Sequence, residues 1–314
     1  MNLFISNFNT LNQFFKRILI FVLFFTALST FIVLSNILII WLHPYKTGQH
    51  IETVIIGDSH TAAAGWPKYI SKSINTSQKA EPLSISYFKA RHIIEHNKKV
   101  KNLIIGLSYH NLSQFNDLKY KDPIWSQEMI SRVYPLISLS EMIAQDINWK
   151  NFIYIYSKSF LTPNSDYYNL IIDKEHGKFP FIGGFGGFNN KSNKKMRTNK
   201  KWLDSRIKRH YYYNDISAVS DLSTLYIGKL AKLAKDENVN IYFVHTPVHR
   251  KYLNDVPKEF KLAYKEIEKT YKTKNVKFLN WSNMITQNKF YKDFDHVNRE
   301  GAKKVSKRLN KIIN

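Results

Sequence analysis

The feature that most constrains this chain is an uncharged apolar segment near its N-terminus, Ile18 to Leu42. It reads ILIFVLFFTALSTFIVLSNILIIWL. About 25 residues without a charge are enough for a helix to cross the hydrocarbon core of a bilayer. A cleavable signal peptide would have a shorter apolar core that ends at small residues, and no such site follows here. We therefore predict an uncleaved membrane anchor at 18–42, between a tail at 1–17 and a domain at 46–314.

The charges beside this segment predict its orientation. Lys16 and Arg17 flank it on the N-terminal side, and Trp41 and Tyr45 lie at the far end, where interfacial aromatic residues are expected. The positive-inside rule then keeps the tail in the cytoplasm and places residues 46–314 outside, in the periplasm or at the cell surface.

Composition limits the chemistry and the partners. The chain has no cysteine, which excludes disulfides, thiolate metal sites and a cysteine nucleophile. Its formal net charge of +23 would attract nucleic acid, anionic lipid head groups or acidic polysaccharide. An extracytoplasmic domain does not meet nucleic acid, so we expect none as a partner. The same charge is also typical of the Lys- and Asn-rich composition that AT-rich genomes encode, and then it is only solvated surface.

Strand and helix patterns alternate through the rest of the chain. Helical patterns cover 83–98, 222–237, 258–272 and 298–313, and Asn298 is placed to cap the last of them. Strands separated by helices favour a parallel sheet covered on both faces. We therefore predict a three-layer α/β/α sandwich, flavodoxin-like, with a five-stranded parallel sheet. The expected strands are 52–57, 73–76, 100–107, 239–245 and 276–280.

Ligands of such a sheet bind beyond the C-terminal ends of its strands, and Gly57-Asp58-Ser59-His60 follows the first strand directly. A serine at a strand-to-helix turn exposes its hydroxyl at the sheet edge, and Gly57 permits the sharp turn. The helix N-terminus behind Ser59 offers backbone N–H groups to an oxyanion. The alternative is that Asp58 and Ser59 only cap a helix.

A second polar motif, Asp293-Phe294-Asp295-His296, lies between the last strand and the last helix. This loop reaches the same edge of the sheet as the turn that carries Ser59. A serine nucleophile needs a base within hydrogen-bond reach, and the base needs an orienting carboxylate. Asp293 and His296 can present both groups from one short loop. The alternative is an exposed polar loop.

Together, the two motifs resemble the SGNH/GDSL hydrolase superfamily. Residues 57–60 match its first block, residues 293–296 match its last, and Asn298-Arg299-Glu300-Gly301 continues in the same manner. The resemblance covers 51–110 and 238–314. It implies a catalytic triad of nucleophile, base and acid, and it is nearest to membrane-anchored envelope branches of the superfamily that modify glycans or transfer acyl groups. The implied triad residues are Ser59, His296 and Asp293.

The resemblance also implies oxyanion donors beside the backbone N–H of Ser59. The family's second block uses a glycine-containing loop, whereas the loop at 75–82 of this chain has no glycine. Any non-proline residue carries a backbone N–H that can serve instead. The expected donors in this loop are Ser77, Gln78 and Ala80. The third block normally supplies an asparagine side chain, and here either Asn111 or His110 takes that position.

Residues 112–222 form an insertion that is too long for an ordinary connection. Phe185 lies in a run of glycine pairs alternating with phenylalanine, which indicates a loop with apolar tips. From 189 to 210 there are nine Lys and Arg residues against one acid, Asp204. This stretch is either a basic lid that holds an anionic polymer or lipid head groups, or a solvated flexible loop.

Four further polar residues are candidates for substrate contacts, together with Phe185. Asp58 and His60 flank the nucleophile. His245 ends the fourth strand and His249 follows it, and at such positions a satisfied structural histidine is the commoner case. The histidines lack a metal-ligand spacing such as H-E-x-x-H, and a serine mechanism needs no metal and no cofactor. We therefore expect neither.

The function that follows is a serine-dependent esterase or O-acyltransferase acting on acyl esters of an envelope or extracellular polysaccharide. Its expected partners are that acylated glycan, the bilayer through 18–42, and a membrane acyltransferase as a further candidate. The alternative from another class is a catalytically silent envelope protein that binds anionic glycan through its basic surface. A lipase on phospholipid is a third reading, supported only by the aromatic glycine-rich loop.

Overall fold

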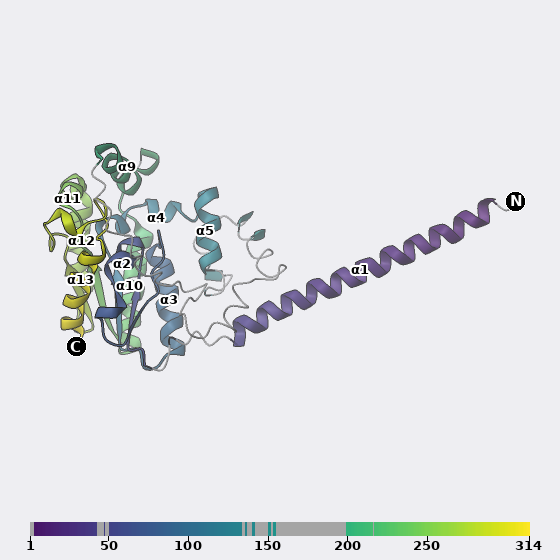
Figure 1. Cartoon of the computed structure of the whole chain (residues 1–314), viewed down its shortest axis with the longest axis horizontal. Coiled ribbons are helices and arrows are strands. Elements are labelled where there is room, and N and C mark those ends of the chain that lie inside the picture. Colours follow the sequence, from purple (N-terminus) through teal and green to yellow (C-terminus); the bar gives the residue numbers. More distant parts are fainter. Residues whose placement is uncertain are drawn as a thin grey trace.

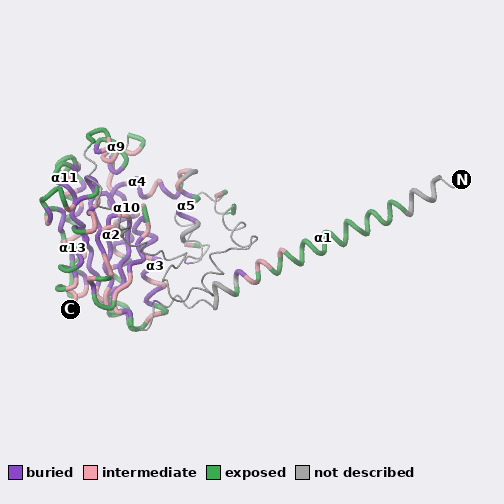
Figure 2. Tube along the Cα trace, viewed as in Figure 1, coloured by how far each residue is buried: buried purple, intermediate pink, exposed green. Residues whose placement is uncertain are grey.

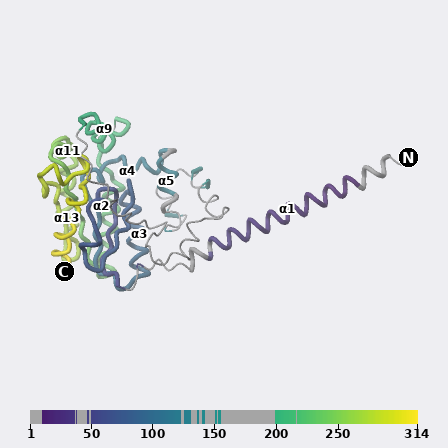
Figure 3. Tube along the Cα trace, in the orientation of Figure 1, coloured from purple at the N-terminus to yellow at the C-terminus, as the bar shows by residue number. Residues whose placement is uncertain are grey.

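The N-terminal helix stands apart from the rest of the molecule. The computed structural model describes residues 3–42, 47, 50–133, 136, 140–141, 150–151, 153–154, 199–215 and 217–314. Helix α1 (Leu3–Leu42) projects from the α/β body as a long rod (Figures 1 and 3). Among the described residues, its stretch Thr10–Asn36 is the one long and apolar enough to cross a membrane, and it is exposed along nearly its whole length (Figure 2). The helix thus ends where the predicted anchor ends, at Leu42, and begins earlier, within the tail that carries Lys16 and Arg17.

The described residues form one five-stranded parallel sheet of order β2-β1-β3-β4-β5. The predicted fold class is confirmed, because each expected strand is present within two residues of its predicted bounds. The strands are β1 (Thr53–Ile56), β2 (Ser73–Asn75), β3 (Asn102–Gly106), β4 (Asn240–His245) and β5 (Val276–Asn280). In register, Ile55 of β1 pairs with Asn75 on one side and Ile104 on the other.

Helices cover both faces of the sheet and bury a separate core on each. Side chains alternate between the faces of a strand, so Val54 and Ile56 enter one core whereas Ile55 enters the other. Buried strands of this kind read as continuous apolar runs, which is why the sequence revealed them. The first face packs against α3 (Leu83–His96), α10 (Asp221–Asp236) and α12 (Lys258–Tyr271), and the second against α2 (Ser59–Ala64) and α13 (Arg299–Ile313). Asn298 caps α13, as predicted, by accepting from the N–H groups of Glu300 and Gly301.

The insertion contains a helix within the basic stretch for which the sequence predicted either a lid or a solvated loop. From residue 199 the chain forms α9 (Lys200–Tyr211), capped by the Asn199 side chain. Leu203 and Tyr211 are buried beneath it, and most of its basic residues face solvent. Phe185 and the basic residues up to 198 lie outside the described residues. The other short elements are η1 (Pro67–Tyr69), η2 (Tyr109–Leu112), α4 (Phe115–Leu118), α5 (Pro123–Val133), η3 (Tyr213–Asp215), α11 (Arg250–Asp255) and η4 (Asn288–Phe290).

A buried ion pair fixes the loop that follows β2. Lys89 on α3 lies 2.6 Å from a carboxylate oxygen of Glu81, and both side chains are fully buried. The Lys89 ammonium also donates to the carbonyl of Thr76, and Ser86 donates to Glu81. A buried pair costs desolvation energy and is tolerated when further hydrogen bonds satisfy its polar atoms. This pair therefore holds the loop in which the sequence predicted oxyanion donors.

A second carboxylate, Asp117, joins the insertion to α10. Ser220, the N-cap of α10, donates to Asp117 of α4 at 2.5 Å. Burial is the largest influence on Asp117, and it raises the pKa of this carboxyl to about 6. Burial therefore disfavours the ionised carboxyl, whereas the hydrogen bond from Ser220 favours it and offsets part of this cost.

Candidate active site

The candidate nucleophile lies where the strand order of the sheet reverses. β1 has β2 on one side and β3 on the other, and ligands of open α/β sheets bind beyond the strand ends at such a point. Gly57 follows β1 with φ of +149°. A Cβ at this position would lie 2.7 Å from Oγ1 of Thr61 and 3.1 Å from the backbone nitrogen of Gly106. Only glycine fits this turn, which places Ser59 at the first residue of α2.

The structure brings together the three residues predicted as a triad. Nε2 of His296 lies 2.9 Å from Oγ of Ser59, and Nδ1 of His296 lies 2.9 Å from Oδ1 of Asp293. The same Asp293 oxygen accepts from the backbone N–H of His296 at 2.8 Å. Asp293 therefore fixes both the backbone and the ring of His296, and the ring reaches a serine 237 positions away in the sequence.

A second carboxylate, Asp295, lies beside the same ring. Its Oδ1 is 3.4 Å from Nδ1 of His296, and its Oδ2 is 3.2 Å from Nε2 of His60 and 3.5 Å from Nε of Arg206. The side chain is 0% exposed, and among the described residues neither of its oxygens has a well-aligned hydrogen-bond partner. Burial raises the pKa of Asp295, but His296 and His60 outweigh it and hold the pKa well below its ordinary value. Asp295 is thus a buried carboxylate among three cationic or polarisable groups.

The two carboxylates determine the charge of His296. Burial alone would lower the pKa of its imidazole, but Asp295 and the hydrogen bond with Asp293 outweigh burial and raise the pKa to about 10. His296 therefore holds both ring protons at neutral pH, and its Nε2 donates to Ser59. A serine mechanism requires the neutral ring as base, so the proton on Nε2 has to leave before His296 can accept one from Ser59.

The buried side chain of Asp58 connects the start of α2 to the segment after β3. Its Oδ1 accepts from the N–H groups of His60 and Thr61, so it caps α2. Its Oδ2 lies 2.5 Å from Nε2 of His110 and accepts from Nδ2 of Asn111 at 3.1 Å. Burial raises the pKa of Asp58, but the histidines and the Asn111 hydrogen bond outweigh it and hold the pKa well below its ordinary value. Asp58 thus occupies the N–H groups of His60 and Thr61, whereas the N–H of Ser59, the donor expected at this turn, is not one of the groups that it binds.

Several expected oxyanion donors also have partners within the protein. The N–H of Ser77 donates to Oδ1 of Asn75, and the N–H of Gln78 donates to the carbonyl of Gly57. Asn111 and His110 were the two candidates for the donor of the family's third block. The side chains of both contact Oδ2 of Asp58. Ala80 has φ of +56° and lies at the end of the same loop. The choice among these donors remains a prediction.

The two histidines after β4 occupy structural positions. His245 is buried, its Nδ1 lies 2.9 Å from the carbonyl oxygen of Thr246, and burial lowers its pKa to about 3. His249 caps α11 through its Nδ1, and its Nε2 lies 2.9 Å from Oδ1 of Asn288. Both are thus tied to backbone and loop groups. Whether either contacts a substrate stays a prediction, as does the role of Phe185.

Helix α9 contributes residues that the sequence did not single out. Arg206 reaches Asp295, and its guanidinium lies over the ring of Trp202 with 4.6 Å to the centroid. One helical turn further, His210 is buried, and its Nδ1 lies 2.6 Å from the hydroxyl of Tyr252. The spacing 202, 206, 210 on one helix face is the signal that could have indicated this inward side.

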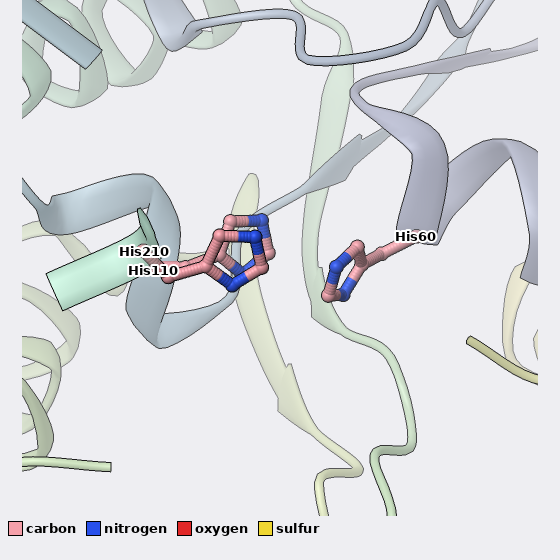
Figure 4. Close-up of side chains that lie close together, drawn as sticks. All are labelled: His60, His110 and His210. Carbon is pink, nitrogen blue, oxygen red and sulfur yellow. The ribbon is translucent and has the colours of Figure 1, made fainter. Parts of the chain in front are cut away.

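His210 also lies next to two histidines of the core, as Figure 4 shows. The rings of His110 and His210 are stacked with centroids 4.8 Å apart, and those of His60 and His110 are 4.1 Å apart. No spacing in the sequence predicted a metal site, yet a ring nitrogen of each of the three lies within 4.8 Å of the others. These residues belong to three separate segments of the chain.

A family model of known proteins matches the C-terminal part of the chain. Residues 193–314 match the family model described as DltD protein. This segment contains α9, β4, β5 and α13, together with Asp293 and His296, whereas Ser59 lies outside it. No curated protein is similar enough to the chain to count as a match.

Proposed function

We propose that this chain is a membrane-anchored serine enzyme that cleaves or transfers acyl esters of a cell-envelope polysaccharide. The observation that carries the proposal is the continuous contact from Asp293 through His296 to Ser59, with 2.9 Å at each step. Ser59 is the first residue of α2, just after β1, and the other two lie in the loop before α13, so the contact depends on the whole fold.

In this proposal the neutral ring of His296 takes the Ser59 proton as Oγ attacks the carbonyl carbon of the ester. The tetrahedral oxyanion collapses, the ester C–O bond breaks, and His296 returns the proton to the leaving alcohol. The acyl group is then attached to Ser59. Attack by water completes an esterase reaction, and attack by a sugar hydroxyl completes an O-acyl transfer. Asp293 keeps the ring of His296 in the required orientation.

The family match supports an envelope setting for this chemistry. Proteins of the DltD family are involved in the D-alanylation of teichoic acids in the cell envelope, in which amino acid esters are attached to a polymer. The pathway includes other membrane proteins, so a membrane acyltransferase is a fitting partner. An exposed apolar helix that crosses the bilayer with its N-terminus in the cytoplasm would place the α/β domain on the side where such polymers lie.

The test is labelling of the full-length protein in detergent by a fluorophosphonate probe, read by mass spectrometry. We expect one adduct, on Ser59, in the wild type and no adduct in Ser59→Ala. His296→Ala should label at least about 100-fold more slowly, because a serine hydroxyl without its base is a poor nucleophile. Circular dichroism must show that each variant is folded. A well-folded wild type without an adduct would contradict the proposal.

A silent glycan-binding protein is the second candidate, and two observations favour it. His296 is protonated in the resting site because of its raised pKa, and the expected oxyanion donors Ser77, Gln78 and Asn111 are bound within the protein. A binder would show unchanged affinity for anionic polysaccharide in Ser59→Ala and no fluorophosphonate adduct in the wild type. The enzyme would show the adduct, whatever its affinity for the polymer.

A further inference from the structure

Three histidines from distant parts of the chain lie together beside the candidate nucleophile. His60 is the second residue of α2, His110 lies in η2 after β3, and His210 lies near the end of α9. All three are buried, with exposed fractions of 3%, 8% and 7%. One ring nitrogen of each lies within 4.8 Å of one ring nitrogen of each of the others. In Figure 4 the rings of His110 and His210 overlap, and the ring of His60 faces them.

Each of these rings has one nitrogen close to a second polar group. Nε2 of His60 lies 3.2 Å from Asp295, Nε2 of His110 lies 2.5 Å from Asp58, and Nδ1 of His210 lies 2.6 Å from the hydroxyl of Tyr252. Metal-binding histidines have this arrangement, because a carboxylate or other acceptor at the far nitrogen fixes the tautomer and makes the near nitrogen a better ligand.

The other ring nitrogen of His60, Nδ1, is separate evidence that a ligand binds among these histidines. It is buried and has no hydrogen-bond partner among the described residues. A buried polar atom without a partner costs about 1–3 kcal/mol, so native structures rarely keep one without a function or a bound ligand. This nitrogen belongs to the same three-histidine group.

We propose that His60, His110 and His210 together bind a divalent transition-metal ion, with Zn²⁺ the best match to three imidazole ligands. The ligands are Nδ1 of His60, Nδ1 of His110 and Nε2 of His210. Tetrahedral zinc holds its nitrogens about 3.3 Å apart, so ring nitrogens that lie within 4.8 Å of one another have to approach by about 1.5 Å at most. A fourth position stays open for water or an oxygen of a bound molecule.

Two other groups of possible ligands are less suitable. His60, Asp295 and His296 also lie together, but both nitrogens of His296 are already engaged, by Ser59 and by Asp293. His92, Glu95 and His96 lie on one turn of α3 and are half-buried or exposed, so they offer an ion no closed surroundings. The three-histidine group has both the burial and the second partners that a specific site needs.

The ion would connect three segments that meet at the C-terminal edge of the sheet. It would hold the turn that carries the nucleophile and the loop after β3 against the inward face of α9. Since α9 also contacts Asp295 through Arg206, occupancy of the site fixes this basic helix beside the loop of Asp293 and His296. The proposal does not depend on whether Ser59 is catalytic.

The test uses the full-length protein in detergent, purified without a histidine tag and stripped of metal with a chelator. Calorimetric titration with ZnCl₂ should give one Zn²⁺ per chain with a Kd below about 1 µM. Co²⁺ should bind at the same site and give the visible absorption of a tetrahedral ion. Zn²⁺ should also raise the melting temperature of the wild type by several degrees, because an ion that binds only the folded state stabilises it.

Variants separate this site from the surface group on α3. His210→Gln should weaken Zn²⁺ binding at least about 100-fold, and His110→Gln should do the same, whereas His96→Ala should leave the affinity unchanged. Glutamine keeps a polar side chain next to Tyr252, and a melting curve of each metal-free variant checks its fold. If one variant fails to fold, the other and the wild-type melting shift still decide the question.

The proposal is overturned if the folded wild type binds no Zn²⁺, or if a folded His210→Gln variant binds Zn²⁺ as tightly as the wild type. Its failure is distinct from a failure of the proposed enzyme, because fluorophosphonate labelling reports on Ser59 and zinc titration does not. Zinc binding without labelling supports the metal site alone, and labelling without zinc binding supports the serine chemistry alone.

Discussion

Replacing Asp293 by asparagine should remove most of the reactivity of Ser59 and leave the fold in place. The amide oxygen of asparagine can still accept from the backbone N–H of His296, which lies 2.8 Å from Oδ1 in the wild type. The amide lacks the negative charge that stabilises the imidazolium, and its amide group can turn the ring to the wrong tautomer. The equivalent change in serine proteases costs about 10⁴-fold, so we expect a loss of about 10²–10⁴-fold, or about 3–5 kcal/mol of barrier.

The assay is the pseudo-first-order rate of fluorophosphonate labelling of Ser59, measured on folded full-length protein. Asp295→Asn is the matched comparison, because Asp295 lies in the same loop but is 3.4 Å from Nδ1 of His296, against 2.9 Å for Asp293. We expect it to change the rate by no more than about tenfold. If Asp295→Asn lowers the labelling rate more than Asp293→Asn does, then Asp295 is the carboxylate that orients His296. A loss below threefold in Asp293→Asn would refute the triad.

Three further predictions concern stability, each measured by thermal melting. Gly57→Ala should cost at least about 2 kcal/mol, because the new Cβ meets Thr61 at 2.7 Å and the φ of +149° is strained for alanine; an unchanged melting temperature would contradict this. Lys89→Met should cost about 3–5 kcal/mol by leaving Glu81 buried without its partner, and adding Glu81→Gln should restore at least half of the loss. The pKa of Asp117 is raised to about 6, so its contribution is favourable below about pH 4 and is lost as the pH rises through 6. The free energy of unfolding of the wild type should therefore fall between pH 4 and 7 by about 2–3 kcal/mol more than that of Asp117→Asn. If the stability of the two proteins varies with pH in parallel, this account is wrong.

The fold was predictable because each strand carries its own signal. β1 and β3 are short apolar runs such as TVII and NLIIG, and burial on both faces of the sheet requires apolar side chains at every position. The cap at Asn298 was equally local, since its side chain binds N–H groups two and three residues ahead. In α9 the basic residues concealed a helix, because its apolar positions are few and its burial depends on contacts with α4 and α11.

The candidate site was predictable only where a short motif carried it. Ser59, Asp293 and His296 belong to two motifs, and the contact between them follows from the ends of parallel strands meeting at one edge. Asp295 lies in the second motif, but nothing in the sequence indicates that it would face His60 and Arg206. Such contacts join residues more than 80 positions apart, so they arise from packing and have no local pattern.

The distribution of buried charge at this edge argues for a function that requires a fixed geometry. Asp58 is paired with His110, and Asp295 is paired with both His60 and His296. Burying a carboxylate costs several kcal/mol, and apolar residues of similar volume would often be at least as stable, so these pairs are poorly explained by stability alone. What they provide is position, because each pair joins the nucleophile turn or its base to another segment. A surface that only binds a polyanion through exposed lysines gains nothing from such an arrangement, whereas a serine that must meet its base within hydrogen-bond reach depends on it.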